Sequence, residues 1–166
     1  LAADIIVAAT GLDMQLLSGA AFTVDGERVD FSRRFNYKGM MYSGVPNLAS
    51  VFGYINASWT LKAELIAKHV CNIVNHMDRG GFTEARPAEP GPDMPPQPWF
   101  DFDSGYIRRG MVNFPKSGTT EPWVAHQNYL KDRRFFQPWT VTDGVLRFSR
   151  GPKAAADAKP REAVAA

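Results

Sequence analysis

Hydrophobic residues along the first part of the chain come in short runs of strand length, separated by turn residues. The run Asp4-Ile-Ile-Val-Ala-Ala9 is apolar and partly β-branched and ends at Thr10-Gly11, a pattern typical of a strand buried on both faces in a parallel sheet. Asp25-Gly26 separates the β-prone runs 21–24 and 28–31, and this dipeptide predicts a β-hairpin. Two further short strands and the turn between them are expected at residues 37–42, 48–52 and 43–47.

A helical period replaces this pattern from Trp59 to about Asp78. The apolar residues expected on one face of the helix are Ile66, Val70, Ile73, Val74 and Met77, and the polar residues expected mostly elsewhere are Lys62, Glu64, Lys68 and Asn72. Asn56 and Ser58 are candidate N-caps, and Gly80-Gly81 is typical of a helix end. This is the longest element that the sequence predicts.

Prolines interrupt the periodic pattern between residues 83 and 98, where half of the chain's twelve prolines lie. Because proline lacks an amide hydrogen and fixes its φ angle, we expect this stretch to be extended or polyproline-like and to form neither a helix nor a strand ladder. Short helices at residues 104–111 and 122–136, a small hairpin at 141–148 and a frayed tail at 154–166 are expected after it.

Composition and charge restrict the class of protein. With 166 residues, 45% of them hydrophobic and 22% charged, the chain has the size and composition of one globular domain. A net charge of +2 is too small to indicate a nucleic-acid partner, and the single cysteine, Cys71, excludes an internal disulfide. Apolar runs are too short to span a membrane and no signal peptide is recognisable, so we expect a cytoplasmic protein. Because Leu1 stands almost directly before a strand, we also expect the chain to be part of a longer one.

The run Gly53-Tyr-Ile-Asn-Ala-Ser-Trp-Thr60 is the strongest candidate site. Glycine and small polar residues that lead into a long helix expose its first amide groups, and these amides together with the helix dipole favour an anion or a partially negative carbonyl. Gly53 would allow a ligand close to the backbone, and Trp59 offers a flat face for an aromatic ring, so a flavin or a phosphate fits. From these residues alone, an ordinary strand–turn–helix with an N-cap and a core tryptophan is the favoured interpretation.

A second candidate is Ala9-Thr10-Gly11, which follows the expected buried strand. Small residues at the carboxyl end of a parallel strand permit close contact with a nucleotide, and an ordinary tight turn explains them as well.

Other reactive side chains favour structural interpretations. His69 and His76 are spaced too widely for a metal-binding pair on a helix and are expected on a solvated face. Cys71 borders the apolar stripe and is expected to be a small buried residue, and Ser58 has no adjacent histidine to activate it as a nucleophile. Arg133-Arg134 is expected on a solvated face or packed against another part of the protein.

At this point several segments carry a resemblance to a known family. Residues 4–12, with Ala9-Thr10-Gly11, resemble the Ala-Thr-Gly strand of class B flavoprotein monooxygenases, the group that contains the Baeyer–Villiger monooxygenases. The segments that resemble a narrower branch, the bacterial Baeyer–Villiger-type enzymes related to the ethionamide-activating monooxygenase of mycobacteria, are residues 37–47, 53–62, 128–132 and 146–148. The block from 37 to 62 is the most specific of these, and the likeness covers nearly the whole chain.

The resemblance implies an α/β enzyme with two Rossmann-type domains, one holding FAD and an inserted one holding NADPH. In such enzymes NADPH reduces the flavin, O2 adds at the flavin C4a atom, and the resulting peroxyflavin oxygenates a ketone or a sulfur or nitrogen centre of a small organic substrate. By motif position, Trp59 would line the active site. The residues that would contact the cofactors are Asn56, Ala57, Ser58, Trp59 and Thr60 at the flavin ring, and Ala9, Thr10 and Gly11 where the NADPH domain returns to the FAD domain.

The sequence also departs from the family pattern. It contains no G-x-G-x-x-G turn and no F-x-G-x-x-x-H-x-x-x-[WF] signature, so both pyrophosphate sites are expected in an N-terminal part that is outside this chain, and the chain alone is expected to be inactive. The resemblance assigns residues 1–82 to the end of the FAD domain, 83–98 to a Pro-rich linker, 99–150 to a C-terminal extension on the main body and 151–166 to a disordered tail. The alternative is a non-catalytic binding module that keeps a flavin-facing edge and uses the Trp- and Arg-bearing segment after residue 99 as its contact surface.

Overall fold

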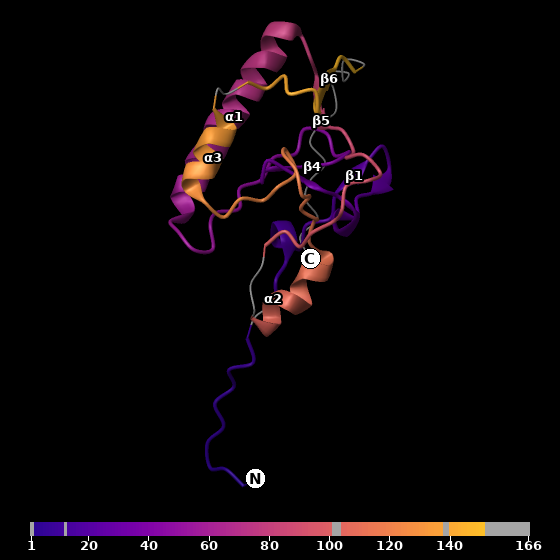
Figure 1. Ribbon diagram of the computed structural model, residues 1–166. Coiled ribbons are helices and arrows are strands. Elements are labelled where there is room, and N and C mark those ends of the chain that lie inside the picture. The colour runs from indigo at the N-terminus through magenta and orange to yellow at the C-terminus, as the bar shows by residue number, and fades with distance from the viewer. Residues whose placement is uncertain (1, 12, 101–103, 138–139, 152–166) are drawn as a thin grey trace.

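The computed structural model describes residues 2–11, 13–100, 104–137 and 140–151 and contains short antiparallel strand pairs and helices (Figure 1). The elements are the 3-10 helices η1 (Leu16–Gly19), η2 (Phe31–Arg33) and η3 (Met111–Asn113), the strands β1 (Thr23–Val24), β2 (Glu27–Arg28), β3 (Asn36–Tyr37), β4 (Met41–Tyr42), β5 (Glu84–Pro87) and β6 (Leu146–Ser149), and the helices α1 (Trp59–Gly80), α2 (Gly105–Gly110) and α3 (Tyr129–Phe136). Within the described residues, the three strand pairs are β1–β2, β3–β4 and β5–β6. The molecule is thus a small α/β arrangement.

The hairpin predicted around Asp25-Gly26 is confirmed. Strands β1 and β2 pair with Thr23 opposite Arg28, and the φ angles of Asp25 and Gly26 are +53° and +85°. Both central residues of a type I′ turn need positive φ, a conformation that aspartate tolerates and glycine adopts without strain. The dipeptide therefore determines this hairpin locally.

The region between residues 36 and 52 differs from the prediction. Instead of one strand over 37–42, the chain reverses at Lys38 and Gly39, which both have positive φ, and forms the β3–β4 hairpin. The predicted strand at 48–52 is wrong, because this segment is irregular and is held by the hydrogen bond from the Ser50 amide to the Met40 carbonyl, 2.8 Å. The turn expected at 43–47 is confirmed.

Helix α1 confirms the predicted helix, with its N-cap at Ser58 and its C-cap at the left-handed Gly81. The buried face is rotated from the predicted one: it comprises Lys62, Leu65, Ile66, His69 and Ile73, while Val74 is 49% exposed. The expectations that Lys62 lies away from the buried face, that His69 is on a solvated face and that Cys71 is buried are therefore wrong, and Cys71 is exposed. Hydrophobicity alone misplaced the face because two polar side chains occupy core positions on it.

Strands β5 and β6 pair antiparallel although they are more than fifty residues apart in the chain. The expectation that residues 83–98 form no strand ladder is wrong for Glu84–Pro87. Pro87 is the last residue of β5, where the missing amide hydrogen of proline is tolerated in a two-stranded sheet. The hairpin expected at 141–148 is also wrong, because Leu146–Ser149 pairs with β5 and not with its own neighbours.

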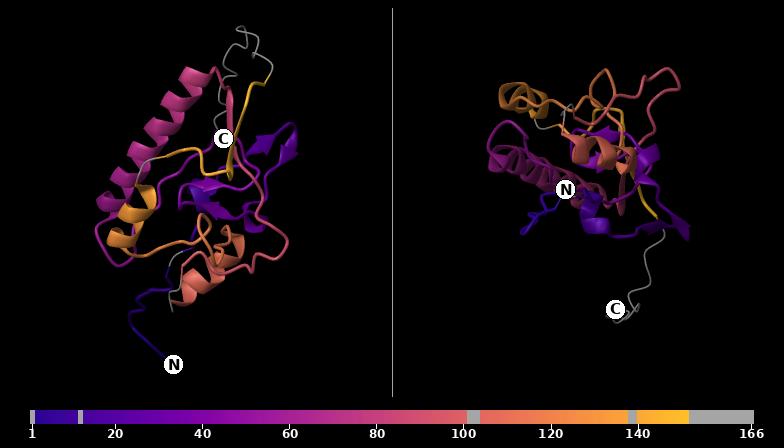
Figure 2. Two further views of the ribbon diagram at one scale, coloured as in Figure 1. Left: turned by 45° about the horizontal axis from the view of Figure 1, so that its top comes forward. Right: turned by 90° about the horizontal axis from the view of Figure 1, so that it is seen from below.

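Of the two later helices, α2 has nearly the predicted length and α3 is shorter than predicted. Helix α2 confirms the helix expected at 104–111, whereas α3 covers only the second half of the predicted 122–136. It begins at Asn128, whose side-chain Oδ1 accepts the Lys131 amide at 3.1 Å, a typical N-cap. Helices α1 and α3 lie side by side in Figures 1 and 2 and pack against each other.

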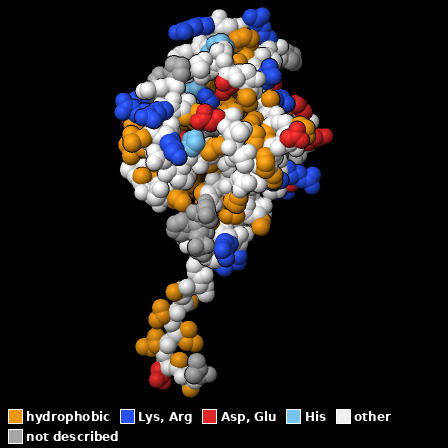
Figure 3. Space-filling model, in the orientation of Figure 1, with side chains coloured by type: hydrophobic (Ala, Val, Ile, Leu, Met, Phe, Trp, Pro, Cys, Tyr) orange, Lys and Arg blue, Asp and Glu red, His pale blue; other side chains and the backbone are white. Residues whose placement is uncertain are grey.

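The first residues do not form the predicted strand. Residues 4–9 run extended away from the body, and Ile5, Ile6 and Val7 are 83%, 86% and 84% exposed (Figures 1 and 3). A strand needs a hydrogen-bonded neighbour, and the described residues place none beside this segment. The tail expected at 154–166 lies outside the described residues.

Two hydrophobic clusters support the elements around the helices. The first, between α1, α3 and the strand pairs, contains Tyr37, Met40, Met41, Leu65, Ile66, Ile73, Ala85, Trp123, Phe136, Val141 and Leu146. The second contains Trp99, Phe100, Ile107 and Phe114, with Phe52 and Ile55 packed against it. In the part of the chain that the structure describes, none of the helices combines the length and apolar character of a membrane span.

Candidate functional site

The segment that precedes α1, residues 53–58, forms a loop that we call the α1 loop. Gly53 and Tyr54 are buried at its start, and the side chains then turn outward. The five residues predicted to contact a flavin, Asn56, Ala57, Ser58, Trp59 and Thr60, are all exposed at the N-terminal end of α1. The structure therefore brings this predicted group together on one surface.

The first turn of α1 lacks the usual side-chain cap. Ser58 occupies the N-cap position, but its hydroxyl makes no capping bond and instead lies 2.8 Å from the Thr60 hydroxyl. The first amide groups of a helix have no partner within the helix, and they carry the positive end of its dipole. The exposed end of α1 therefore presents hydrogen-bond donors suited to an anionic or carbonyl ligand.

Trp59 contributes a half-exposed aromatic surface beside these donors. Its indole is 48% exposed and packs on Phe52, with ring centroids 5.0 Å apart. The ring also covers the backbone of Gly53, where a methyl group would overlap the indole. The expected role of Gly53 as a place for a ligand to approach is therefore wrong, because the tryptophan fills that space.

Phe52 connects Trp59 to the second hydrophobic cluster. The Phe52 ring stacks on Phe100 at 5.2 Å, with an angle of 13° between the planes, and lies 5.0 Å from Trp99. A row of packed aromatic rings thus fixes the inner face of Trp59 and leaves its other face accessible.

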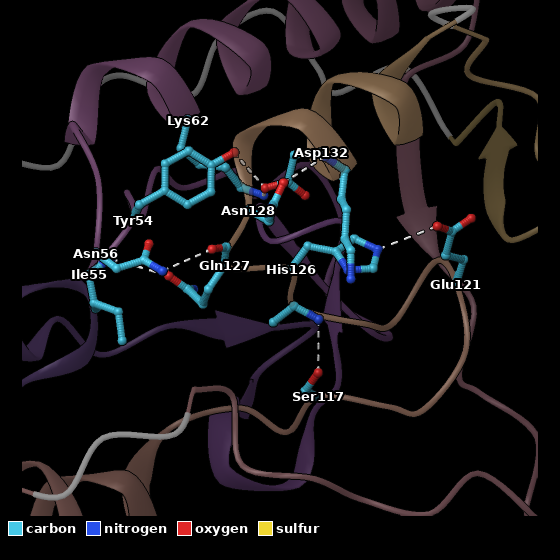
Figure 4. Close-up of polar contacts among 12 residues, drawn as sticks. Tyr54, Ile55, Asn56, Lys62, Ser117, Glu121, His126, Gln127, Asn128 and Asp132 are labelled. Carbon is cyan, nitrogen blue, oxygen red and sulfur yellow. Dashed lines mark hydrogen bonds and ion pairs between the residues drawn. The ribbon is translucent and has the colours of Figure 1, made fainter.

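The α1 loop is tied to the segment that leads into α3 (Figure 4). The Ile55 amide donates to the side-chain Oε1 of Gln127 at 3.2 Å, and the Asn56 side-chain amide donates to the Gln127 carbonyl at 3.1 Å. Gln127, which is about seventy residues away in sequence, therefore fixes two successive residues of the loop.

A buried group of three residues lies under the loop, and we call it the Asp132 group: Tyr54, Lys62 and Asp132 (Figure 4). The Tyr54 hydroxyl donates to Asp132 Oδ2 at 2.6 Å, and Lys62 Nζ contacts the same oxygen at 2.6 Å. Burial raises the pKa of the Tyr54 hydroxyl, and the Asp132 carboxylate raises it further. Burial lowers the pKa of Lys62, while the charge of Asp132 opposes that effect and favours the ion pair.

His69 lies on the same buried face of α1, about two turns after Lys62. The side chain is fully buried, and neither ring nitrogen has a hydrogen-bond partner among the residues that the structure describes. Its ring packs edge-on against Phe136 at 5.3 Å. Burial, with a smaller contribution from the charge of Lys38, lowers the pKa of His69 to about 4, so the side chain is neutral at pH 7.

The second predicted group, Ala9, Thr10 and Gly11, is exposed in the extended N-terminal segment. Gly11 lies close to Tyr106 of α2, and no described hydrogen bond joins residues 9–11 to the α1 loop. The structure therefore brings together the residues of the first predicted group but does not unite the two groups.

Sequence reasoning missed Gln127, Asp132, Tyr54 and Lys62 as residues that shape this site. One signal was present: Lys62, Ile66, His69 and Ile73 follow helical spacing, so the lysine lies on the same face as core residues. A lysine on a buried face requires a nearby carboxylate, but Asp132 is seventy residues away and no local pattern identifies it.

Comparisons with known proteins support a relationship to flavin enzymes. The chain is 46% identical over 152 residues to the FAD-containing monooxygenase EthA of Mycobacterium tuberculosis, which covers 92% of this chain and 31% of that protein. It is 47% identical over 150 residues to EthA of Mycolicibacterium smegmatis (90% and 30%), and 41% identical over 162 residues to the "Probable FAD-binding monooxygenase AlmA" of an Acinetobacter species (97% and 33%). No family model matches the chain, and no solved structure matches it. By sequence the chain is therefore similar to part of the EthA and AlmA monooxygenases, and it spans about a third of the length of these relatives.

Proposed function

We propose that this chain supplies the flavin-facing part of an FAD- and NADPH-dependent monooxygenase of the Baeyer–Villiger type. The complete enzyme would insert one oxygen atom of O2 into ketones or oxidise sulfur or nitrogen centres of small organic molecules. The observation that carries the proposal is the exposed N-terminal end of α1, with an uncapped first turn and a half-exposed Trp59, in a chain 46% identical to an FAD-containing monooxygenase.

The residues present at this surface fit the pyrimidine edge of a flavin. Its carbonyl oxygens are acceptors that gain negative charge on reduction, and the first amides of α1 are donors at the positive end of a helix dipole. Trp59 would lie against the ring system and limit access of substrate and water, while Asn56, Ala57, Ser58 and Thr60 would border the ring edge. The bound flavin itself supplies the redox chemistry with O2 and NADPH.

The proposal extends to the N-terminal segment and to the division of the chain. Residues 1–82 would complete the Rossmann-type FAD domain, with Ala9, Thr10 and Gly11 where an inserted NADPH domain returns to it. The exposed Ile5, Ile6 and Val7 support this placement, because apolar side chains of this kind are stable in a sheet interior and not in water. Residues 83–98 would be a linker and 99–150 an extension on the main body.

The test uses the protein purified from the complete reading frame that contains this chain. We expect it to carry a visible flavin absorption band and to oxygenate a ketone or sulfide with NADPH. Trp59→Ala should reduce oxygenation at least about tenfold while flavin content changes little, because the ring positions reactants and does not hold the phosphates. Trp59→Phe, which keeps an aromatic face, serves as the matched control.

Two results would contradict the proposal. A complete protein without bound flavin would favour a non-catalytic binding module, for which the exposed Arg133 and Arg134 offer a contact surface. Unchanged product formation by Trp59→Ala would refute the placement of Trp59 at the reacting centre and leave the flavin assignment intact.

A further inference from the structure

We propose that Gln127 and Asp132 are positioning residues that hold the α1 loop and the first turn of α1 in the geometry that receives the flavin ring. This inference rests on the proposed function. It concerns two residues that contact the α1 loop and α1 through Tyr54, Ile55, Asn56 and Lys62 and that are not among the residues proposed to contact the flavin.

The two residues contact the beginning of the loop, its middle and the first turn of α1 that follows it. Asp132 accepts from Tyr54 before the loop turns outward and pairs with Lys62 in the first turn of α1, both at 2.6 Å. Between these two points Gln127 accepts from the Ile55 amide at 3.2 Å and from the Asn56 side chain at 3.1 Å. Residues 54–62 are therefore bracketed by a single six-residue segment, which Figure 4 shows facing the loop.

That segment is itself fixed, so it can act as a support. Asn128 caps α3 through the Lys131 amide, and the Asp132 amide donates to the Asn128 carbonyl at 3.0 Å. Upstream, the Ser117 hydroxyl accepts the Ala125 amide at 3.0 Å and donates to the Trp123 carbonyl at 3.1 Å. A shift of residues 127–132 should therefore displace the α1 loop, because the hydrogen bonds of Gln127 and the contacts of Asp132 join this segment to it.

Gln127 does not use the amide groups of the first α1 turn, of which the Leu61 amide donates to the Ser58 carbonyl at 3.3 Å. The Ile55 amide and the Asn56 side chain are the loop donors that Gln127 uses, and they precede the helix. Preorganised donors lose little free energy when a ligand binds, since the loop does not have to be ordered at that moment. Loss of the support should therefore weaken flavin binding without removing any atom that contacts flavin.

The Asp132 carboxylate is a poor first probe, because its removal leaves Lys62 buried without a counter-charge and should strongly destabilise the whole protein. Tyr54→Phe is cleaner: it removes one hydroxyl, keeps the ring, and leaves the Lys62–Asp132 ion pair in place. Gln127→Met removes the acceptor for the Ile55 amide at similar size.

The chain offers a matched control in a second buried group, which we call the Asp143 group: Tyr37, Lys38 and Asp143. The Tyr37 hydroxyl donates to Asp143 Oδ2 at 2.5 Å, and Lys38 Nζ lies 3.5 Å from the same atom. Tyr37→Phe therefore removes the same kind of hydrogen bond, but its partner is in the segment before β6 and not in the α3 segment. Both substitutions should lower the melting temperature by similar amounts.

The experiment measures the dissociation constant of FAD and the visible spectrum of the bound flavin in the complete protein and its variants. We expect Tyr54→Phe and Gln127→Met to weaken FAD binding by roughly three- to tenfold and to shift the flavin absorption band, the range that loss of one hydrogen bond produces. Tyr37→Phe should leave FAD affinity within about twofold of wild type.

The outcomes separate this inference from the proposed function. If Tyr54→Phe and Tyr37→Phe change FAD affinity and the flavin spectrum equally, or if neither Tyr54→Phe nor Gln127→Met changes them, Gln127 and Asp132 are merely structural and the inference is overturned while the proposed function stands. If the wild-type complete protein carries no flavin, the proposed function fails, and the inference fails with it.

Discussion

The Asp132 group and the Asp143 group use the same three residue types but place the carboxylate differently. In each group a tyrosine hydroxyl and a lysine contact one Oδ2 atom, and each lysine lies over a phenylalanine ring of α3, Lys62 over Phe136 and Lys38 over Phe135. The Asp132 side chain is 1% exposed, and its ion pair measures 2.6 Å; the Asp143 side chain is 20% exposed, and its ion pair measures 3.5 Å.

The surroundings of the two carboxylates explain this difference. Asp143 lies in the segment before β6, where its Oδ1 accepts the amides of Val145 and Leu146 at 2.9 and 3.0 Å. Burial alone would raise the pKa of Asp143, but the hydrogen bond from Tyr37, the two amides and Lys38 together lower it. Backbone amides and solvent thus also stabilise the Asp143 carboxylate, whereas Lys62 and Tyr54 stabilise the Asp132 carboxylate. We therefore expect substitutions in the Asp143 group to reduce the free energy of unfolding less than substitutions in the Asp132 group.

The largest expected effect is a difference between the groups in the stability lost when the aspartate is replaced. Asp132→Asn leaves Lys62 buried without a counter-charge and should reduce the free energy of unfolding by about 3–5 kcal/mol. Asp143→Asn should reduce it by only about 1–2 kcal/mol, because Lys38 is farther away and the site reaches water. Urea denaturation, followed by the circular dichroism of the helices, measures both losses.

A double substitution provides the control. Replacing the buried pair together, with Lys62→Met and Asp132→Leu, should recover most of the stability that Asp132→Asn loses, because no unpaired charge remains. Equal losses from Asp132→Asn and Asp143→Asn would show that burial of the carboxylate does not distinguish the two groups.

A second, smaller effect concerns His69, which packs on Phe136 of the first group's helix and senses the charges of Lys38 and Asp143 in the second. Its pKa is about 4 in the folded protein and about 6.5 when unfolded, so the unfolded state binds the proton first as pH falls. The free energy of unfolding is therefore unaffected by His69 well above pH 6.5 and decreases as the pH falls toward 4, by about 2 kcal/mol at pH 5.

The measurement compares wild type with His69→Leu, which keeps the position apolar. Denaturation midpoints between pH 7.5 and pH 5 should fall less steeply in the variant than in wild type, since the other titrating groups are common to both proteins. Parallel pH profiles would mean that the pKa of His69 is the same in the folded and unfolded proteins, so that burial does not lower it.

These comparisons also indicate what the sequence could predict. Asp25-Gly26 determines its hairpin, and the periodicity from Trp59 onward with Gly81 at its end determines α1, because turn geometry and helical spacing are local properties. The run 53–60 is recognisable for the same reason, because it is consecutive and leads into a helix, whereas contact of Asn56–Thr60 with a flavin stays a prediction from the resemblance.

The errors share one cause, which is dependence on distant segments. Pairing of β5 with β6 and the ion pair of Lys62 with Asp132 join residues that no local pattern connects. The same ion pair allows Lys62 to lie on the buried face with Leu65, Ile66 and Ile73, and on this face His69 is buried while Cys71 is exposed against expectation. Residues 4–9 have the pattern of a buried strand, but a strand forms only beside a neighbour, and the described residues supply none.

The smallest expected effect tests whether the two groups are independent. Tyr54→Phe and Tyr37→Phe each remove one buried hydroxyl donor and should each cost about 1 kcal/mol of the free energy of unfolding. The groups share no hydrogen bond among the described residues, and one contact between them is that of Phe135 with Phe136, whose ring centroids are 5.9 Å apart. The double variant should therefore lose the sum of the single losses to within about 0.5 kcal/mol in the same urea denaturation. A larger deviation would mean that the two tyrosines act as one buried network across α3, and a change at Asp143 would then reach the α1 loop through the aromatic pair.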